Sequence, residues 1–482
     1  MIVGGYEMAE LTPKKTKVIC TIGPASSTED TLTAMVKAGM NCMRLNFSHG
    51  THPDHLEKIQ MMRKINDSLG TNVAILLDTK GPEIRTGDFE NGQIEIVKGD
   101  QVVVCYEDVL GNKDRFSITY KNLYMDVKAG DHILVNDGQM DLLVDSIKDR
   151  DIYCTCLNDG ILKNKRGINV PGIKLGFDYL SEKDISDIIF GCENKVDFIA
   201  ASFVRRAQDV LDVRRLLVEH DCPEIQIIAK IENQEGVENM DEILEVVDGI
   251  MVARGDLGVE IPGDLVPVVQ KKLIKKCNAV GKIVITATQM LESMQQNPRP
   301  TRAEVSDVAN AIHDGTDCIM LSGESASGKY PVEAVAMMAQ IARTTEDNLD
   351  YGHLHRRALR TAPADKSEAI CLSVAELAMQ FDVKAIIAFT KSGFTARKMS
   401  RYRPECQLIA ATPDLDAMQK LALNWGVIPA SCKSMKSSEA MLNLAEVIAK
   451  ENGVKSGETI IVTGGTPGIS GATNFLHLIE VK

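Results

Sequence analysis

Short apolar segments alternate with amphipathic stretches along most of the chain. Eight of these segments are almost continuously apolar, which is typical of strands buried on both faces of a parallel sheet. Amphipathic stretches such as 181–190 and 207–217 have the period of helices that connect such strands. The pattern therefore predicts an α/β fold, a (β/α)8 barrel. The predicted strands are 17–21, 40–44, 73–78, 196–201, 225–230, 249–253, 282–287 and 317–321.

The barrel pattern is interrupted between its third and fourth strands. Segments 93–97, 101–104 and 132–135 alternate or are short, and Gly-Asp and Asp-Gly pairs separate them. We therefore expect a small all-β domain, residues 83–171, inserted in a βα loop. The barrel itself is expected to comprise residues 1–82 and 172–345.

A second α/β pattern follows the barrel. It contains a helical stretch at 367–380 and apolar strand-like segments at 385–390, 407–412 and 459–463. These elements predict a separate C-terminal α/β domain over residues 346–482.

Polar side chains follow six of the eight predicted strands. In a (β/α)8 barrel the carboxyl ends of the strands meet at one rim, so these side chains are expected to converge. Lys230 and Glu232 are two positions apart and leave an extended strand by the same face. An ordinary ion pair closing the strand is the alternative for these two alone. The rim residues are Arg44, Asn46, Ser48, His49, Asp78, Thr79, Lys230, Glu232, Arg254, Gly255, Asp256, Thr286, Thr288 and Glu324.

The residue types at this rim suit phosphoryl transfer. Two carboxylates, Glu232 and Asp256, fit Mg²⁺ or Mn²⁺, which keep further positions free for substrate oxygens. Asp256 is also placed to cap a helix that begins near Gly255, where backbone amides can receive a small anion. Lys230 and Arg44 supply positive charge for a phosphoryl group. Oxygen ligands for a weakly held monovalent cation are offered by Asn46, Ser48, Asp78 and Thr79.

Composition narrows the class of protein. The 482 residues suggest roughly three domains, and 44% hydrophobic residues suffice for sizeable cores. A net charge of −13 without a long basic run disfavours a nucleic-acid partner. The twelve cysteines contain no CxxC pair and fit reduced thiols in a cytoplasmic protein. We expect no signal peptide and no membrane segment.

Several long motifs closely resemble those of the pyruvate kinase family, in the same order, from about residue 14 to the C-terminus. They are MRLNFSHG (43–50), LDTKGPEIRTG (77–87), AKIENQEG (229–236), GIMVARGDLGVEIP (249–262), ATQMLESM (287–294), PRPTRAEVSDVANA (298–311) and IMLSGESASGKYP (319–331). The resemblance implies transfer of the phosphoryl group of phosphoenolpyruvate to ADP, which gives ATP and pyruvate in glycolysis.

The resemblance also implies roles for individual residues. Glu232 and Asp256 resemble the divalent-metal ligands, and Lys230 resembles the lysine that stabilises the transferred phosphoryl group and the enolate. Arg44 resembles a phosphate ligand, and Thr288 resembles the residue near the protonated enolate carbon. The implied substrate-binding set is Arg44, Lys230, Gly255, Asp256 and Thr288. The implied potassium ligands are Asn46, Ser48, Asp78 and Thr79. Glu83 matches the residue found in potassium-requiring members of the family. The implied nucleotide-side residues are Asn46, His49, Arg85 and Lys165.

The C-terminal domain carries an expected effector site. Thr390, Lys391, Ser392, Gly393 and Thr395 follow a predicted strand and open a helix, so they can cradle a phosphate or simply cap that helix. The stretch resembles the effector loop of the family and implies a phosphorylated sugar or a nucleotide. The late loop 463–471 lacks the tryptophan and arginine of some fructose 1,6-bisphosphate-responsive members. The resemblance also implies a homotetramer, with the inserted domain acting as a lid.

Two other functions compete with this interpretation. A metal-dependent aldolase or lyase acting on pyruvate-like acids would use Glu232 and Asp256, but would leave Arg44 and the potassium-like ligands without a role. A non-catalytic sensor of sugar phosphates would need only the C-terminal loop, and would not need the costly charges at the rim.

Overall fold

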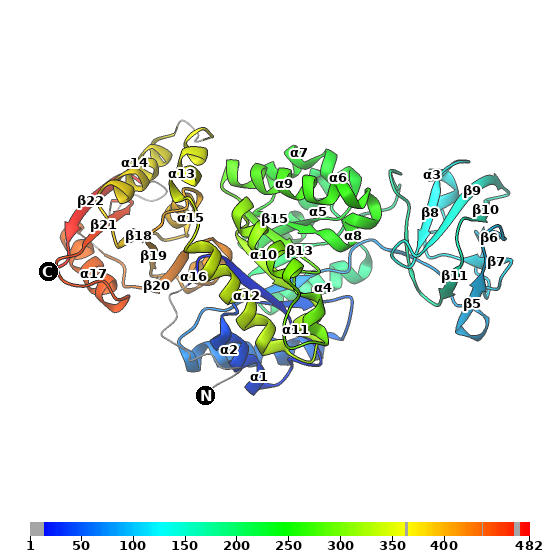
Figure 1. The fold of residues 1–482 in the computed structure, drawn as a ribbon, viewed down its shortest axis with the longest axis horizontal. Helices are drawn as coiled ribbons and strands as arrows, with labels where there is room; N and C mark the ends of the chain where they lie inside the picture. The colour runs from blue at the N-terminus through cyan, green and yellow to red at the C-terminus, as the bar shows by residue number, and fades with distance from the viewer. Residues whose placement is uncertain (1–13, 362–364, 436, 467–472) are drawn as a thin grey trace.

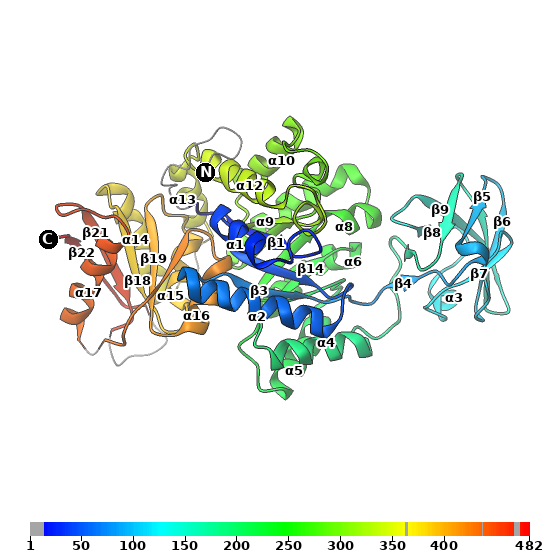
Figure 2. The ribbon, with the colours of Figure 1, turned by 90° about the horizontal axis from the view of Figure 1, so that it is seen from below.

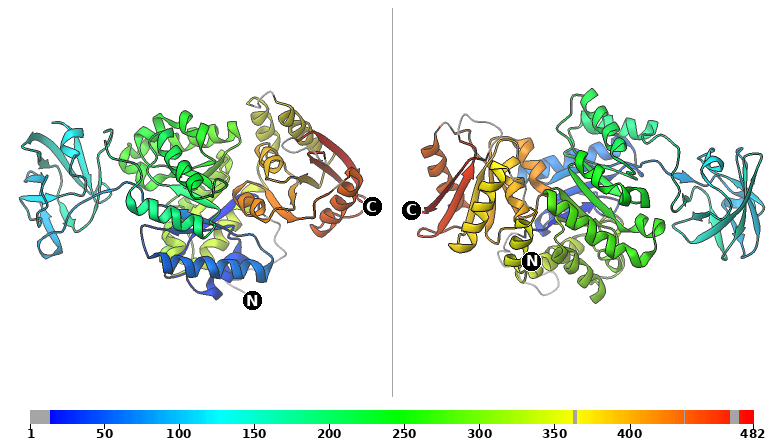
Figure 3. Two further views of the ribbon diagram at one scale, coloured as in Figure 1. Left: turned by 180° about the vertical axis from the view of Figure 1, so that it is seen from behind. Right: turned by 90° about the horizontal axis from the view of Figure 1, so that it is seen from above.

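The computed structural model describes residues 14–361, 365–435, 437–466 and 473–482. A closed barrel occupies its centre, with a small β-rich unit at one end and an α/β unit at the other (Figure 1). The further views show the same linear arrangement of the three parts (Figure 3). The predicted fold class is confirmed.

The central barrel contains eight parallel strands, closed in the order β1-β17-β16-β15-β14-β13-β3-β2. The ends of the predicted strands differ from the observed ends by at most two residues. The strands are β1 (Lys17–Thr21), β2 (Cys42–Asn46), β3 (Ala74–Asp78), β13 (Phe198–Ala201), β14 (Gln226–Ile231), β15 (Gly249–Ala253), β16 (Ile283–Ala287) and β17 (Cys318–Leu321).

Alternation along each strand divides the apolar residues between two cores. Ile19 of β1 packs inside the barrel with Leu76 and Phe198, whereas its neighbours Val18 and Cys20 pack outward beneath the helices. Both faces of the strands are buried, which explains why the sequence shows continuous apolar runs instead of alternation.

Helices surround the barrel, and several begin at residues that cap them. Ser181 and Asp184 form a capping box at the start of α4, and Thr301 and Glu304 form another at the start of α10. The helices are α1 (Glu29–Ala38), α2 (His52–Leu69), α4 (Glu182–Glu193), α5 (Ala207–Glu219), α6 (Gln234–Glu238), α7 (Met240–Val246), α8 (Arg254–Glu260), α9 (Val266–Val280), α10 (Arg302–Asp314), α11 (Gly323–Ala326) and α12 (Pro331–Glu346).

The inserted segment is built mainly of strands. A seven-stranded sheet has the order β4-β12-β8-β9-β10-β6-β7, and β11 pairs with β5 in a second sheet. Figure 2 shows β4 in the connection between this unit and the barrel. The elements are β4 (Ile84–Arg85), β5 (Gln93–Ile96), β6 (Gln101–Cys105), β7 (Arg115–Ser117), α3 (Leu123–Asp126), β8 (His132–Val135), β9 (Met140–Lys148), β10 (Asp151–Cys156), β11 (Gly160–Lys163) and β12 (Gly167–Asn169).

The C-terminal unit has a five-stranded sheet in the order β20-β19-β18-β21-β22. Its last strand pairs antiparallel with β21, and the other strands are parallel. The elements are α13 (Tyr351–Leu359), α14 (Lys366–Gln380), β18 (Ala385–Phe389), α15 (Phe394–Arg401), β19 (Gln407–Thr412), α16 (Leu415–Lys420), β20 (Val427–Ser431), α17 (Ser438–Glu451), β21 (Thr459–Gly464) and β22 (Phe475–Glu480). Across the described ranges, no helix combines the length and apolar character that a bilayer crossing requires.

Candidate active site at the barrel rim

Asp78 lies between two cationic side chains at the carboxyl end of β3. Its Oδ2 atom accepts a hydrogen bond from Nε of Arg44 at 2.6 Å, and its Oδ1 atom accepts one from Nζ of Lys230 at 3.1 Å. Asp78 is 1% exposed, and Arg44 and Lys230 are each 8% exposed. Three strands thus bring two positive charges to one buried carboxylate.

This pairing keeps Asp78 and Lys230 charged. Burial alone would favour the neutral acid, but Arg44 and Lys230 hold the pKa of Asp78 below its ordinary value. Burial would likewise lower the pKa of Lys230, but Asp78 and Glu232 raise it above its ordinary value. The rim therefore presents a fixed ammonium and a fixed guanidinium at neutral pH.

Glu232 is the second carboxylate beside Lys230. Its Oε1 atom lies 3.0 Å from Nζ of Lys230, and its Oε2 atom accepts a hydrogen bond from the backbone N–H of Phe203 at 2.6 Å. Burial, reinforced by the charge of Asp256, raises the pKa of Glu232 to about 7. Lys230 and Glu232 therefore leave the same face of the chain, as their two-residue spacing predicted.

Asp256 lies in the first turn of α8, which follows β15 directly. It acts on the pKa of both Lys230 and Glu232, so the three charges share one site. Within the described ranges, Asp256 forms no ion pair with a lysine, arginine or histidine. Its carboxylate is free to bind a cation.

The residues present fit a divalent ion with an open coordination sphere. Two carboxylates of the chain are available, and no cluster of three or more histidine, cysteine, aspartate or glutamate side chains is found in the described residues. Mg²⁺ and Mn²⁺ are commonly held by one or two carboxylates, with the remaining positions taken by water or substrate oxygens. Glu232 and Asp256 would thus fill part of the coordination sphere of the ion and leave the other positions to oxygens of a bound substrate.

Thr288 closes another side of the rim with an unusual backbone. Its φ angle is +67°, in the left-handed region that β-branched residues rarely adopt. Its Oγ1 atom accepts a hydrogen bond from the N–H of Gly255 at 2.9 Å and donates one to the carbonyl of Ala287 at 2.7 Å. The hydroxyl of Thr288 therefore links the end of β16 to the first turn of α8.

The expected monovalent-cation ligands surround the same cluster. Asp78 uses both oxygens for Arg44, Lys230 and Ser202. The Oδ1 atom of Asn46 accepts a hydrogen bond from the backbone N–H of Ser48 at 3.1 Å. Thr79 is buried, and its Oγ1 atom accepts a hydrogen bond from the N–H of Ser202 at 3.2 Å. These residues are gathered at the ends of β2 and β3.

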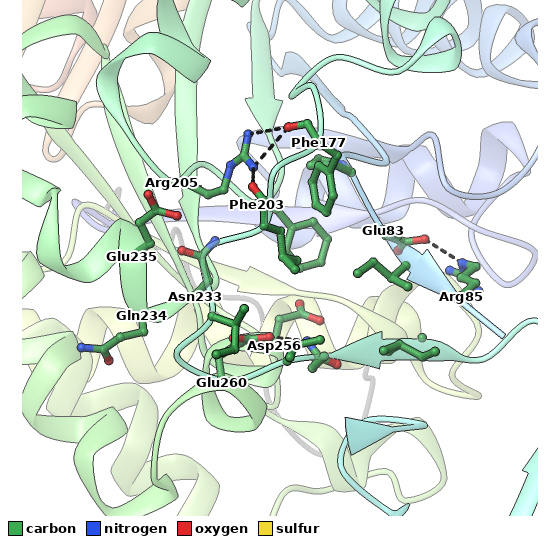
Figure 4. A pocket seen from close by; sticks show the side chains of 18 of the residues that line it. Glu83, Arg85, Phe177, Phe203, Arg205, Asn233, Gln234, Glu235, Asp256 and Glu260 are labelled. Atoms are coloured by element: carbon green, nitrogen blue, oxygen red, sulfur yellow. Dashed lines mark hydrogen bonds and ion pairs between the residues drawn. The ribbon is translucent and has the colours of Figure 1, made fainter. Parts of the chain in front are cut away.

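A cavity of about 430 Å³ extends from this rim toward the inserted unit. Figure 4 shows Asp256 and Glu260 on the barrel side and Glu83 and Arg85 at the base of the inserted unit. The Nε atom of Arg85 donates to Oε2 of Glu83 at 2.7 Å. His49 also lines the cavity, so two of the expected nucleotide-side residues face it.

Lys165 is placed differently from the sequence expectation. Its side chain is not among the residues that line the cavity, and its carbonyl accepts a hydrogen bond from Arg85 at 2.8 Å. Arg166 and Lys174 line the cavity instead. The sequence analysis did not select Arg166, which is adjacent to Lys165, or Lys174, which follows β12.

Two further residues missed by the sequence analysis belong to the charged cluster. Ser202 follows β13, accepts a hydrogen bond from Lys230 at 2.8 Å and donates one to the carbonyl of Thr79 at 2.7 Å. Thr21 ends β1 and accepts a hydrogen bond from Nη1 of Arg44 at 2.8 Å. Thr21 ends a barrel strand and Ser202 directly follows one, which was the available signal. The sequence analysis gave more weight to charged residues than to neutral hydroxyls.

The expected effector loop lies between β18 and α15. Lys391 and Ser392 are exposed, and Gly393 adopts a φ angle of +81°, which allows the turn into the helix. The N–H of Thr390 donates to the carbonyl of Ala411 at 3.0 Å. The hydroxyl of Thr395 is buried and lies 2.8 Å from that of Thr473, so it faces the protein interior. Most of the late loop 463–471 lies outside the described residues.

The fold and its rim define a barrel enzyme that can bring together a divalent cation, fixed positive charges and an anionic substrate. Two family models match the chain: "Pyruvate kinase, barrel domain" over residues 13–335 and "Pyruvate kinase, alpha/beta domain" over residues 368–479. The chain belongs to the pyruvate kinase family.

Individual relatives agree with this assignment. The chain is 52% identical to a pyruvate kinase of Staphylococcus saprophyticus over 97% of its own length and 80% of that protein. It is 49% identical to a pyruvate kinase of Clostridium acetobutylicum over 97% of its length and 100% of that protein. A crystal structure of a pyruvate kinase from Cryptosporidium parvum superposes with a TM-score of 0.93 at 39% identity, covering 98% of this chain and 97% of the other.

Proposed function

We propose that this chain is a phosphotransferase that moves the phosphoryl group of phosphoenolpyruvate to ADP, giving ATP and pyruvate in glycolysis. The observation that carries this proposal is the buried cluster of Lys230, Arg44, Asp78 and Glu232 beside the free carboxylate of Asp256. Membership of the pyruvate kinase family supports the same reaction.

The cations of the cluster act by position and charge. Lys230 is oriented by three oxygen partners, so its ammonium meets the transferring phosphoryl group without reorganising. Arg44 is held by Asp78 and Thr21 and binds the phosphate. The ammonium of Lys230 also neutralises negative charge on the enolate oxygen after the phosphoryl group leaves.

Glu232 and Asp256 would hold Mg²⁺ or Mn²⁺. The ion would supply positive charge that stabilises the negative charge of the substrate. Glu232 is kept in place by Lys230 and the N–H of Phe203. Asn46, Ser48, Asp78 and Thr79 are proposed to hold K⁺, since their oxygens gather beside Arg44 and Lys230.

Thr288 completes the substrate site. Its hydroxyl positions the N–H of Gly255, which belongs to the turn that would receive the substrate carboxylate. The same hydroxyl is placed to hold a water molecule that protonates the enolate carbon to give pyruvate.

The cavity beneath the inserted unit is the proposed ADP site. Arg85, Arg166 and Lys174 line it and would contact the phosphates of the nucleotide, and His49 lines the same cavity. Closure of the inserted unit over the rim would exclude water while ADP is bound, which protects the phosphoryl group from hydrolysis. Asn46 and Lys165 are proposed to support the same side of the site.

Regulation and assembly are part of the proposal. Thr390, Lys391, Ser392, Gly393 and Thr395 form the proposed site for a phosphorylated sugar or nucleotide, supported by the exposed turn at Lys391 and Ser392. We also propose a homotetramer. The twelve free cysteines support a cytoplasmic location. The proposed domain limits are 1–82 and 172–345 for the barrel, 83–171 for the inserted domain and 346–482 for the C-terminal domain.

A coupled assay of ATP formation tests the function. Phosphoenolpyruvate, ADP and Mg²⁺ are expected to give ATP, and replacement of K⁺ by Na⁺ is expected to reduce the rate. Cleavage of a keto acid without ATP formation would instead support the aldolase or lyase, and ligand binding without turnover would support the sensor.

A further inference from the structure

The turn that follows β2 carries two of the four proposed K⁺ ligands. The Oδ1 atom of Asn46 accepts a hydrogen bond from the N–H of Ser48 at 3.1 Å, and the carbonyl of Asn46 accepts one from the N–H of His49 at 3.2 Å. The N–H of Phe47 donates to the carbonyl of Asp78, a third proposed ligand, at 2.9 Å. The position of Phe47 therefore determines how the turn meets the end of β3.

His55, near the start of α2, packs against this turn at two points. Its ring stacks on the ring of Phe47, with 4.0 Å between the centroids and 14° between the planes. Its Nε2 atom lies 2.9 Å from the carbonyl oxygen of His49. A carbonyl oxygen only accepts, so Nε2 carries the proton and donates. One side chain thus contacts the residues on both sides of Ser48.

The chemistry of His55 shows that packing alone does not explain it. The residue is 4% exposed, and its Nδ1 atom has no hydrogen-bond partner among the described residues. Burial lowers the pKa of His55 to about 4, so the ring is neutral at neutral pH. A buried ring nitrogen without a partner costs free energy, which a phenylalanine at this position would avoid. The N–H donated by Nε2 is therefore the feature that distinguishes the histidine.

The backbone around His55 fixes its position. The N–H of His55 donates to the carbonyl of Thr51 at 3.1 Å, and the N–H of Thr51 donates to Oδ2 of Asp54 at 2.9 Å. Gly50 has a φ angle of +78°, which glycine adopts readily, and a Cβ atom at this position would lie 3.4 Å from Nε2 of His55. The imidazole is thus enclosed between the first turn of α2 and the chain that leads into it.

We propose that His55 is a positioning residue for the monovalent-cation site at the barrel rim. Its imidazole holds Phe47 and His49 in place. The oxygens of Asn46 and Ser48 are thereby kept ready for the cation, and a turn that had to be ordered during binding would bind the cation more weakly. This inference rests on the K⁺ site of the proposed function.

Direct cation binding tests this role. Tl⁺ serves as the probe for K⁺, and its binding to the full-length protein is followed by thallium NMR at constant ionic strength. His55→Phe keeps an aromatic ring but removes the donor, and is expected to weaken Tl⁺ binding by about three- to tenfold, as for the loss of one hydrogen bond. His55→Gln keeps an N–H donor, and its affinity is expected to lie between those of wild type and His55→Phe.

Rescue by K⁺ separates positioning from a general loss of structure. ATP formation by His55→Phe is expected to need about three- to tenfold more K⁺ for half of its maximal rate, and to reach the wild-type rate when K⁺ saturates. Binding of Mn²⁺, measured by electron paramagnetic resonance, is expected to stay unchanged. Its proposed ligands Glu232 and Asp256 follow β14 and β15, which are not neighbours of β2 in the barrel.

His355 of the C-terminal unit provides a matched control. It is also 4% exposed, its Nε2 atom lies 2.7 Å from Oε2 of Glu376, and its Nδ1 atom has no partner within the described ranges. His355→Phe therefore removes the same kind of buried group at a site remote from the turn. It is expected to leave Tl⁺ binding and the K⁺ requirement at wild-type values.

The outcomes distinguish this inference from the K⁺ site itself. Wild-type Tl⁺ affinity in a folded His55→Phe protein would refute the role of His55 and leave the K⁺ site standing. An equal loss of affinity in His355→Phe, or a rate that saturating K⁺ does not restore, would also refute it. Absence of Tl⁺ binding and of a K⁺ response in wild type would refute the K⁺ site and this inference together. His55→Leu, which also lacks the donor, replaces His55→Phe if that protein does not fold.

Discussion

The side-chain amide of Asn169 donates a hydrogen bond to Oε1 of Glu260 at 2.7 Å. Asn169 ends β12 of the inserted unit, and Glu260 ends α8 of the barrel. Both residues line the cavity proposed for ADP, so this bond is a direct side-chain link across its two walls. Burial raises the pKa of Glu260, and the hydrogen bond from Asn169 opposes this shift by stabilising the carboxylate.

Asn169→Ala is expected to loosen the inserted unit and weaken ADP binding. A hydrogen bond to a charged group contributes about 1.5–3 kcal/mol, so the KM for ADP should rise by about tenfold or more. Steady-state kinetics measure this change, and hydrogen exchange in β12 reports the loosening. Glu260→Gln keeps an accepting oxygen and serves as the control with nearly normal KM. Unchanged KM and exchange in Asn169→Ala would exclude a role for this link.

Thr288→Ala is expected to lower kcat by about 10²-fold, since proton-transfer groups typically contribute at least this much. It is also expected to raise the KM for phosphoenolpyruvate, because the turn that would receive the substrate carboxylate loses its hydrogen bond to this hydroxyl. The substitution removes the hydroxyl that accepts from Gly255. Thr288→Ser retains the hydroxyl and also removes the β-branch from a residue at φ +67°, so it should stay within a few-fold of wild type. Equal loss of kcat in both variants would point to backbone conformation and away from the hydroxyl.

Asp197 provides a pH test of stability away from the active site. Its Oδ2 atom accepts a hydrogen bond from the N–H of Ile75 at 2.7 Å, and burial raises its pKa from 3.8 to about 7. Between these values the folded protein keeps a proton that the unfolded chain has lost. The contribution of Asp197 to stability is therefore full below about pH 4 and declines up to about pH 7, by about 1.4 kcal/mol per pH unit.

Asp197→Asn removes this dependence while keeping the oxygen that accepts from Ile75. Urea denaturation at pH 5 and pH 8 should show the variant gaining stability relative to wild type at the higher pH. A difference between variant and wild type that is the same at both values would contradict the raised pKa.

Much of the barrel and its rim could be predicted because both depend on local periodicity. A strand buried on both faces gives a continuous apolar run, so β1 and β15 were located at their observed bounds. The spacing of Lys230 and Glu232 gave their common direction, and the rule that strand ends meet at one rim placed Arg44 and Asp78 with them.

Other features depend on contacts that sequence spacing does not specify. Ser202 was missed because a serine after a strand is common in any loop, and only its distances to Lys230 and Asp78 distinguish it. The edge strands β20 and β22 were also missed, because their exposed faces interrupt the apolar pattern. A cavity at the amino end of the barrel brings Lys14 together with Arg343 and Pro429, and no periodicity relates these positions.

The central claim is that the ammonium of Lys230 supports phosphoryl transfer at the barrel rim. The most direct measurement is single-turnover formation of ATP from saturating phosphoenolpyruvate and ADP, with quenching at short times, in wild type and Lys230→Met. The account predicts a fall of about 10²–10³-fold or more in the rate of transfer, since a preorganised charge at the reacting group is lost. Lys183→Met removes a partly exposed lysine that pairs with Asp187 and should transfer at the wild-type rate. A folded Lys230→Met protein that forms ATP as fast as wild type would contradict the account.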